Sequence, residues 1–405
     1  MRVALKITAA LLIVAGIVAC FMFLPKELTA GGIASSEFPD LSAYDESSGI
    51  LRETLSDKDR LLYDAIAQGL LNRDDQVVVR STEYSSAEVE QILQKVIMDH
   101  PEIFWADYGG FYYMLSQNGV TLTLSYNCTP EELAKKKEAF NAALDKYAGA
   151  AEGAENDYDA ALKVHDRLIE DCDYDLTGEL TDVHNAYGAL VENVAVCDGY
   201  AYAYKCIMDR LGIECRTITG TATNGMEANV GHAWNIVKLD GKYTFVDCTW
   251  DDMDASGGTR AVASKRAVTH SFFANGTEKF YLDHRTNYLQ SGSEEIPAAV
   301  DISWYEANEV KGETVEDIET TAAEMLISNL KDGVSFFEVQ ITDPDEYEDL
   351  YRNGGIADII ETANDILYES DSEDEFADSA RFYLIDREHG CIMAVCGLKD
   401  VDLAA

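Results

Sequence analysis

The chain has 405 residues, and its 74 acidic side chains against 31 basic ones give a formal net charge of −43. Apolar residues make up 47% and charged residues 26% of the composition, which excludes a disordered or collagen-like chain and allows two or three full-sized domains. A surface this acidic repels nucleic-acid phosphate and anionic lipid, so we expect neither as a partner of the folded part.

The first thirty residues differ in composition from the rest of the chain. Arg2 and Lys6 precede the run Ile7–Leu24, which has no charged side chain. Its length lies between the core of a signal peptide, about 7–15 residues, and a membrane-spanning helix of about 20. Positive charge before such a run directs the following chain out of the cytoplasm. We therefore predict an exported protein that is anchored by this segment or secreted after cleavage near Ala30, with lipidation at Cys20 as a less favoured alternative.

The chain has nine cysteines, and they form no CxxC pair. The sequence therefore indicates neither a zinc knuckle nor a thioredoxin motif, and the wide spacing of the cysteines does not resemble a disulfide framework. We expect Cys206 and Cys215 to pack in a core, with a disulfide between them as the alternative.

The chain then divides into a linker and a small domain. Residues 31–50 are polar and contain several Gly and Ser residues, which is typical of a linker. Residues 51–128 predict an N-terminal α/β domain, in which a helix follows Ser56 and a hairpin turns at Asn118-Gly119.

A new unit begins where Thr129, Pro130 and Glu132 form a capping box with proline in the first helical position. Helices are expected at about 130–150, 157–171 and 197–211, and strands at 214–221, 232–239 and 242–248. Helices followed by antiparallel strands define an α+β domain, which we extend from 129 to 296. Residues 297–405 predict a third, small α/β domain, and its sequence indicates no function.

Three residues of the central unit together supply what a thiol nucleophile needs. Cys197 begins the helix 197–211, where unpaired backbone N–H groups and the helix dipole favour a thiolate. A cysteine nucleophile also needs a histidine base, and that histidine needs a carboxylate to orient it. His232 begins one predicted strand and Asp247 lies near the end of the next, so this sequence contains all three groups.

The turn between these two strands predicts how the histidine and the carboxylate are related. A two-residue turn at Asp240-Gly241 pairs His232 with residue 249 and Asp247 with residue 234. The two residues then lie two positions apart on the same face of the sheet, at about 7–8 Å between backbone positions. That separation permits a hydrogen bond between the imidazole and the carboxylate.

Four segments around these residues resemble the transglutaminase-like superfamily, in its bacterial exported branch, over about residues 155–255. The segments are Ala186–Val191, Val196–Ala201, Gly231–Asn235 and Val246–Asp252. The resemblance implies a papain-related α+β core, here flanked by two small α/β domains. It also implies a triad in which Cys197 is the nucleophile, His232 the general base and acid, and Asp247 the orienting carboxylate. Family members make or break amide bonds through a thioester, and we expect no cofactor and no metal.

The rest of the site is less well defined by the sequence. The backbone N–H of Cys197 supplies one donor to the oxyanion, and Tyr187 and Asn185 are candidates for the second. Trp234 and Trp250 are expected in the core or the wall of the cleft, with Trp250 nearer to the substrate.

Two other groups of residues invite a metal interpretation, and we reject both. Asp251, Asp252 and Asp254 lack the glycine and the final glutamate of an EF-hand, so we expect a solvated loop. A second group does not have the spacing of a zinc finger and is expected on helix and loop surfaces: His165, Cys172 and His184.

The sequence therefore predicts an exported thiol enzyme that acts on amide bonds of a peptide or protein, cell-wall peptide included. Hydrolysis is favoured over acyl transfer to an amine, because no amine acceptor site is defined. The alternative is a non-catalytic surface protein that uses the same fold for binding or as a scaffold.

Overall fold

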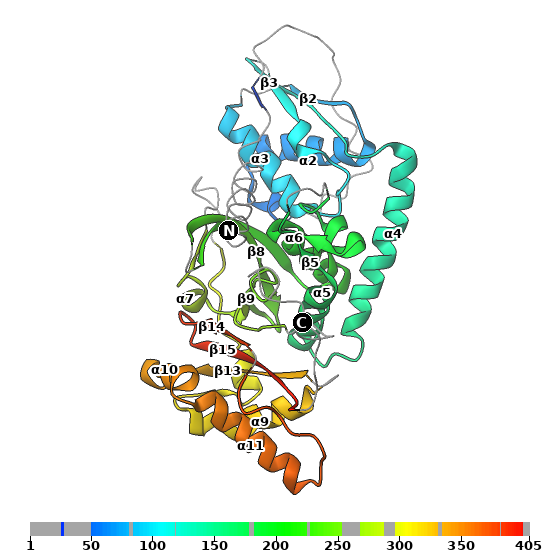
Figure 1. The fold of residues 1–405 in the computed structure, drawn as a ribbon. Coiled ribbons are helices and arrows are strands. Elements are labelled where there is room, and N and C mark those ends of the chain that lie inside the picture. Colours follow the sequence, from blue (N-terminus) through cyan, green and yellow to red (C-terminus); the bar gives the residue numbers. More distant parts are fainter. Residues whose placement is uncertain are drawn as a thin grey trace, which may run out of the picture. The chain divides into compact units, whose positions relative to one another are not determined.

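The structure is a computed structural model that describes most of the chain beyond residue 50 (Figure 1). The described residues are 26–27, 50–80, 84–117, 119–177, 182–224, 227–252, 268–286, 296–330, 334–380 and 382–399. Ile7–Leu24, Cys20 and Ala30 therefore lie outside them. Among the described helices, none combines the length and the apolar character that crossing a membrane requires.

The chain divides into two compact units, each built from discontinuous segments. The first unit contains Met1–Val164, Cys172–Gly241 and His284–Pro297. The second unit contains His165–Asp171, Lys242–Asp283 and Ala298–Ala405. The predicted boundaries at 128 and 296 are not decided by this division and stay predictions.

The first unit starts with a four-stranded sheet and two helices, which include the helix after Ser56 and the hairpin that the sequence predicts; the strand at 26–27 was not predicted. The sheet has the order β1-β3-β4-β2, with β1 Lys26–Glu27, β2 Gln76–Arg80, β3 Tyr112–Ser116 and β4 Gly119–Thr123. The helices are α2 Asp57–Asn72 and α3 Ser86–Asp99, which pack against each other. Ser56 caps α2 by accepting a hydrogen bond from the backbone N–H of Asp59, at 3.3 Å.

The helices of the central region follow. They are α4 Pro130–Ala148, α5 Asp157–Asp171, a π-helical turn Gly188–Glu192 and α6 Cys197–Leu211, with a short parallel pair β5 Asp173–Tyr174 and β6 Val194–Ala195. The predicted capping box is present, because the Thr129 hydroxyl accepts from the Glu132 N–H and the Glu132 carboxylate accepts from the Thr129 N–H. α6 ends at Gly212, which has a φ of 75°. α4 packs beside α6 (Figure 1).

A sheet covers α6 within the first unit. β8 Glu227–Leu239 pairs antiparallel with β7 Cys215–Asn224, and β11 His284–Thr286 pairs antiparallel with the other edge of β7. The Asn235 side chain joins helix and sheet, because its amide donates to the carbonyl oxygen of Ala201 at 3.0 Å. Asp240 and Gly241 follow β8 with φ angles of 49° and 82°, as the predicted type I′ turn requires.

The second unit contains β9 Lys242–Val246 paired with β10 Phe273–Asn275, and a four-stranded sheet of order β12-β13-β15-β14. These strands are β12 Lys311–Gly312, β13 Val334–Ile341, β14 Phe382–Asp386 and β15 Cys391–Gly397. Its helices are α7 Thr277–Phe280, α8 Trp304–Ala307, α9 Val315–Ser328, α10 Pro344–Arg352 and α11 Gly355–Glu369. α9 packs on β13, and α11 packs on α9 (Figure 1).

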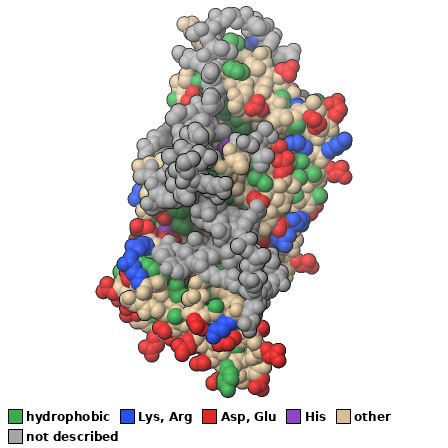
Figure 2. Space-filling model, viewed as in Figure 1, with side chains coloured by type: hydrophobic (Ala, Val, Ile, Leu, Met, Phe, Trp, Pro, Cys, Tyr) green, Lys and Arg blue, Asp and Glu red, His purple; other side chains and the backbone are tan. Residues whose placement is uncertain are grey.

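Each region buries an apolar core, and the predicted α+β class is confirmed. The C-terminal sheet and its helices enclose a core that is fully buried and contains Leu326, Phe337, Val339 and Ile359. Figure 2 shows acidic side chains dispersed over the described part of the face in view, with a few Lys and Arg among them. Dispersed charge of this kind fits a solvated surface.

Candidate functional site

Cys197 is the first residue of α6, where the sequence predicts the nucleophile. Val196 precedes it with extended backbone and has no side-chain oxygen with which to cap the helix. The N–H groups of the first turn therefore stabilise negative charge at this end. Cys197 is 1% exposed and packs with Ala201 and Ala233.

A close backbone approach fixes this end of α6. The N–H of Val196 donates to the carbonyl oxygen of Val183 at 3.0 Å. A Cβ on Gly199 would lie 2.4 Å from that same oxygen and 2.8 Å from the Cβ of Ala195. Only glycine lets the first turn of α6 dock this closely.

His232 lies in β8 opposite Gly220 of β7, and it is 5% exposed. Its ring centroid lies 5.9 Å from that of Trp234 and 5.5 Å from that of His284. Trp234 is 1% exposed and thus buried, and its place in the wall of a cleft stays a prediction. Its ring takes the space beside Gly220, where a Cβ would lie 2.5 Å from the indole.

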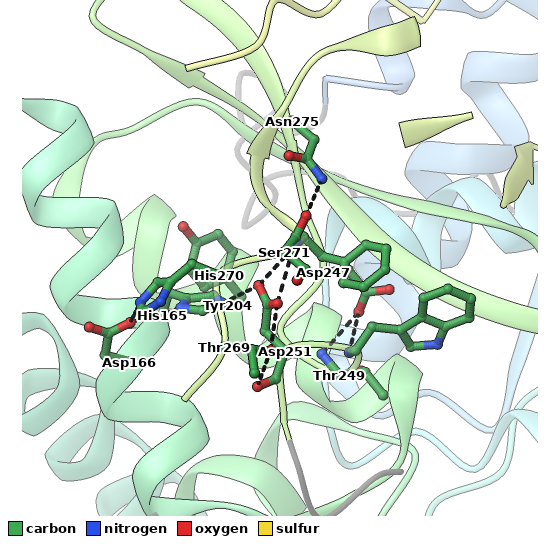
Figure 3. A network of polar contacts seen from close by, with 12 residues as sticks. His165, Asp166, Tyr204, Asp247, Thr249, Asp251, Thr269, His270, Ser271 and Asn275 are labelled. Carbon is green, nitrogen blue, oxygen red and sulfur yellow. Dashed lines mark hydrogen bonds and ion pairs between the residues drawn. The ribbon is translucent and has the colours of Figure 1, made fainter. Parts of the chain in front are cut away.

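Asp247 lies just after β9, in the second unit, and is 1% exposed. One carboxylate oxygen accepts from the backbone N–H of Thr249 at 2.9 Å and from that of Trp250 at 3.2 Å (Figure 3). The Asp247 N–H donates to the carbonyl oxygen of Phe272 at 3.0 Å. These bonds fix the orientation of the carboxylate. Because Cys197 and His232 belong to the first unit, the triad stays a prediction.

The two oxyanion candidates are used differently in the structure. The Asn185 side-chain oxygen accepts from the N–H groups of Tyr187 and Gly188, and its amide donates to Asp182 at 3.1 Å. Asn185 therefore shapes the entry to the π-helical turn. The Tyr187 ring lies 4.4 Å from the Lys136 ammonium, and burial raises the pKa of its hydroxyl. The oxyanion role of either residue stays a prediction.

Trp250 is half-buried, and its ring packs edge-on against Phe272 at 5.0 Å between centroids. It is thus more exposed than Trp234, in line with the expected difference between the two. A contact of Trp250 with substrate is still a prediction.

The sequence interpretation missed a partner of the residue that follows the nucleophile. His184 Nδ1 lies 3.0 Å from a carboxylate oxygen of Asp198, in the first turn of α6. The negative charge of Asp198 raises the pKa of His184, although burial opposes that shift. Nothing in the local sequence indicates a pair whose members are 14 positions apart.

Several residues expected at the surface are buried. His165 and Cys172 are each 0% exposed, and Asp251 and Asp252 are 0% and 2% exposed instead of forming a solvated loop. His165 Nε2 lies 3.1 Å from Asp251, whose carboxylate also accepts from the Thr269 hydroxyl at 2.9 Å (Figure 3). The predictions were wrong because helix spacing and EF-hand spacing do not reveal partners that are remote in sequence. Asp254 lies outside the described residues.

The same network continues in the second unit through a second histidine. His270 lies between Asp166, 3.1 Å from Nε2, and Glu338, 2.9 Å from Nδ1. Burial alone would lower the pKa of His270, but the two carboxylates outweigh it and raise that pKa to about 10. Burial would raise the pKa of Asp166, yet His270 and His165 hold it well below its usual range.

Eight cysteines lie among the described residues, none of them in a disulfide, and most are buried. Cys206 and Cys215 pack in the core of the first unit, as expected, with no disulfide between them. Burial raises the pKa of both thiols well above the usual value, and raises those of Cys391 and Cys396 to about 12. These four thiols are protonated and unreactive near neutral pH.

Residues 145–254 match the model of the Transglutaminase-like superfamily. The resemblance to this superfamily that was noted in the sequence over about residues 155–255 is thus confirmed. A curated relative, kyphoscoliosis peptidase of Homo sapiens, is 27% identical over 101 residues, which are 23% of this chain and 14% of the relative.

Solved structures include similar chains. A TGase is 12% identical with a TM-score of 0.26, and the match covers 61% of this chain and 62% of the TGase. A candidate cysteine protease from Cytophaga hutchinsonii is 17% identical with a TM-score of 0.24, and the match covers 32% and 50% of the two chains.

Proposed function

We propose that this protein is a thiol enzyme that acts on amide bonds through a thioester on Cys197. The observation that carries the proposal is the position of Cys197 as the first residue of a helix without a capping side chain, inside the region that matches the superfamily. In the proposed triad, His232 is the general base and acid, and Asp247 orients its imidazole.

The reaction proceeds in two steps. The Cys197 sulfur attacks the carbonyl carbon after its proton passes to His232, and the backbone N–H of Cys197 donates to the oxyanion. The C–N bond then breaks, and the amine leaves with the proton from His232. Water attacks the thioester in the second step, with His232 again taking the proton, and releases the acid and the free thiol. An amine in place of water would give acyl transfer instead.

The substrate is a peptide or a protein, cell-wall peptide included, and the enzyme works outside the cytoplasm. The uncharged run Ile7–Leu24 behind a positive start supports export. Protease added to intact cells should digest the full-length protein, and Leu12→Arg within the run should leave it protected. Protection of the unaltered protein would contradict export.

Trapping the acyl-enzyme tests the chemistry. Full-length protein is mixed with cell-wall digest and with a glutamine peptide, quenched in acid and weighed intact. We expect an adduct on Cys197 that hydroxylamine removes, and its loss in Cys197→Ala. His232→Ala and Asp247→Asn should reduce its formation by at least about 100-fold and 10-fold.

The burial of Cys197 against Ala201 and Ala233 favours a second candidate, a non-catalytic binding or scaffold protein. In that case the same peptides would bind equally well to Cys197→Ala and no adduct would form. That pair of results would contradict the enzyme proposal.

A further inference from the structure

We propose that His165, Asp166 and His270 bind one divalent transition-metal ion, zinc by preference. All three residues belong to the second unit. His165 and Asp166 are neighbours on α5, and His270 precedes β10. The triad proposed above does not use them, so this inference stands independently of the enzyme proposal.

The three candidate ligand atoms are already grouped. His165 Nδ1 lies 2.9 Å from Asp166 Oδ1, and His270 Nε2 lies 3.1 Å from the same oxygen. One ligand atom from each residue lies within 4.8 Å of the others. Ligand atoms about 2.1 Å from a tetrahedral zinc ion lie roughly 3.4 Å apart, so a metal ion needs only small movements of these side chains.

The far nitrogen of each imidazole faces a carboxylate. His165 Nε2 lies 3.1 Å from Asp251, and His270 Nδ1 lies 2.9 Å from Glu338. A proton on each of these nitrogens leaves the other nitrogen of each ring with a lone pair directed at the site of the ion. Metal-binding histidines usually have such a carboxylate partner, which fixes the ring and raises its basicity.

The orienting carboxylates are themselves held. Asp251 accepts from the backbone N–H of Phe272 at 3.0 Å in addition to Thr269. Glu338 accepts from the backbone N–H of His270 at 2.8 Å and from the Tyr305 hydroxyl. The rings of His270 and Trp304 stack at 4.0 Å between centroids. The ligands are therefore in place before an ion arrives (Figure 3).

The alternative to a bound metal ion is a pair of protonated histidines, and the charges around the two rings distinguish the two cases. Three carboxylates surround the two imidazoles, and two protons or one divalent cation would each add two positive charges to them. Two imidazolium ions would place like charges in buried rings whose centroids are 5.7 Å apart. One ion between the rings avoids that repulsion, because it uses neutral imidazoles. Asp166, with 37% of its side chain exposed, gives the ion access to solvent.

Metal binding to the full-length protein tests the proposal. Protein stripped with chelator is titrated with zinc chloride by calorimetry, and the cobalt form is examined by visible spectroscopy. We expect one zinc ion per chain, bound at micromolar concentration or below, a higher melting temperature with zinc, and a cobalt spectrum without thiolate bands. Asp166→Asn and His270→Gln should each weaken binding at least about 10-fold.

His389→Gln is the matched control. His389 is another buried histidine of the second unit, with Asp386 2.9 Å from Nδ1, but its Nε2 faces the carbonyl oxygen of Lys279. Its substitution should leave zinc affinity unchanged. Asp166→Asn keeps the size of the side chain and one of its oxygens, and its circular dichroism should match that of the unaltered protein. Absence of zinc binding, or equal affinity in Asp166→Asn and His270→Gln, would overturn the proposal and leave a pair of protonated histidines.

Discussion

At the scale of single residues, the residue after the predicted nucleophile forms a titratable pair with His184. Asp198 follows Cys197 directly and raises the pKa of His184. A histidine whose pKa is higher in the folded state stabilises the fold fully below its unfolded pKa of about 6.5. That contribution declines as the pH rises through the folded pKa.

The Asp198→Asn variant tests this pair. It removes the charge that raises the pKa of His184 but keeps an oxygen to accept the N–H of Gly199, which lies 2.9 Å away. We expect its melting temperature to lie furthest below that of the unaltered protein under pH 6.5, and the gap to narrow at higher pH. Scanning calorimetry across the pH range measures the gap. A gap that is constant with pH would show that His184 is not titrating against Asp198.

Single-residue positions were predictable where local rules decide them. Helix spacing predicted Cys197 at the start of α6. The same rules wrongly predicted that His165 and Asp251 are solvated. These two residues contact each other, but they lie 86 positions apart in the sequence, and no local pattern connects them. The oxyanion role of Asn185 stays a prediction, and its hydrogen bonds to the N–H groups of Tyr187 and Gly188 follow the common tendency of asparagine to bond nearby backbone.

At the scale of elements, the docking of α6 depends on one glycine. Alanine at position 199 would gain up to about 1 kcal/mol from helix propensity. Its Cβ would meet the Val183 oxygen at 2.4 Å, however, and overpacking of this kind costs about 1–3 kcal/mol or more. We expect Gly199→Ala to lower the melting temperature and to displace the start of α6.

Gly149→Ala is the matched control. Gly149 has a φ of −62°, and a Cβ there meets nothing within 4 Å. This substitution should be neutral or stabilising by up to about 1 kcal/mol. Equal melting temperatures for Gly199→Ala and Gly149→Ala would contradict the close docking of α6.

Most elements followed from periodicity, capping and turns. α5 and α6 match their predicted bounds, and α4 begins at Pro130, where the capping box places it. The sequence analysis missed α10, although Asp343 caps it and Pro344 fills its first position. The π-helical turn Gly188–Glu192 has no comparable signal, because it depends on the approach of Gly188 to the Asp182 carbonyl oxygen.

At the scale of the whole molecule, residues 242–283 form one compact unit with residues 298–405. The Val300 N–H donates to the Tyr243 carbonyl oxygen at 2.8 Å, and His270 pairs with Glu338. A chain ending at residue 297, the predicted domain boundary, loses these partners. We expect it to melt well below the full-length protein and to be cut by protease within 242–283.

A chain ending at residue 400 is the control, since it keeps β15 and should melt like the full-length protein. If the chain ending at 297 resists protease and keeps the melting temperature of the full-length protein, the division into two units is wrong and the predicted boundary is right. Sequence patterns locate a linker by its composition. They do not reveal that the segment before the linker and the segment after it share a core.

The reactivity of Cys197 at neutral pH is the most direct test of the proposed enzyme. Full-length protein is treated with limiting iodoacetamide at pH 7, and labelling of each thiol is followed by peptide mass spectrometry. Cys206 and Cys215 are internal references, because burial raises their pKa. We expect Cys197 to react at least about 10-fold faster than either, and His232→Ala to remove the difference. Labelling of Cys197 no faster than Cys206 and Cys215 would contradict an activated nucleophile.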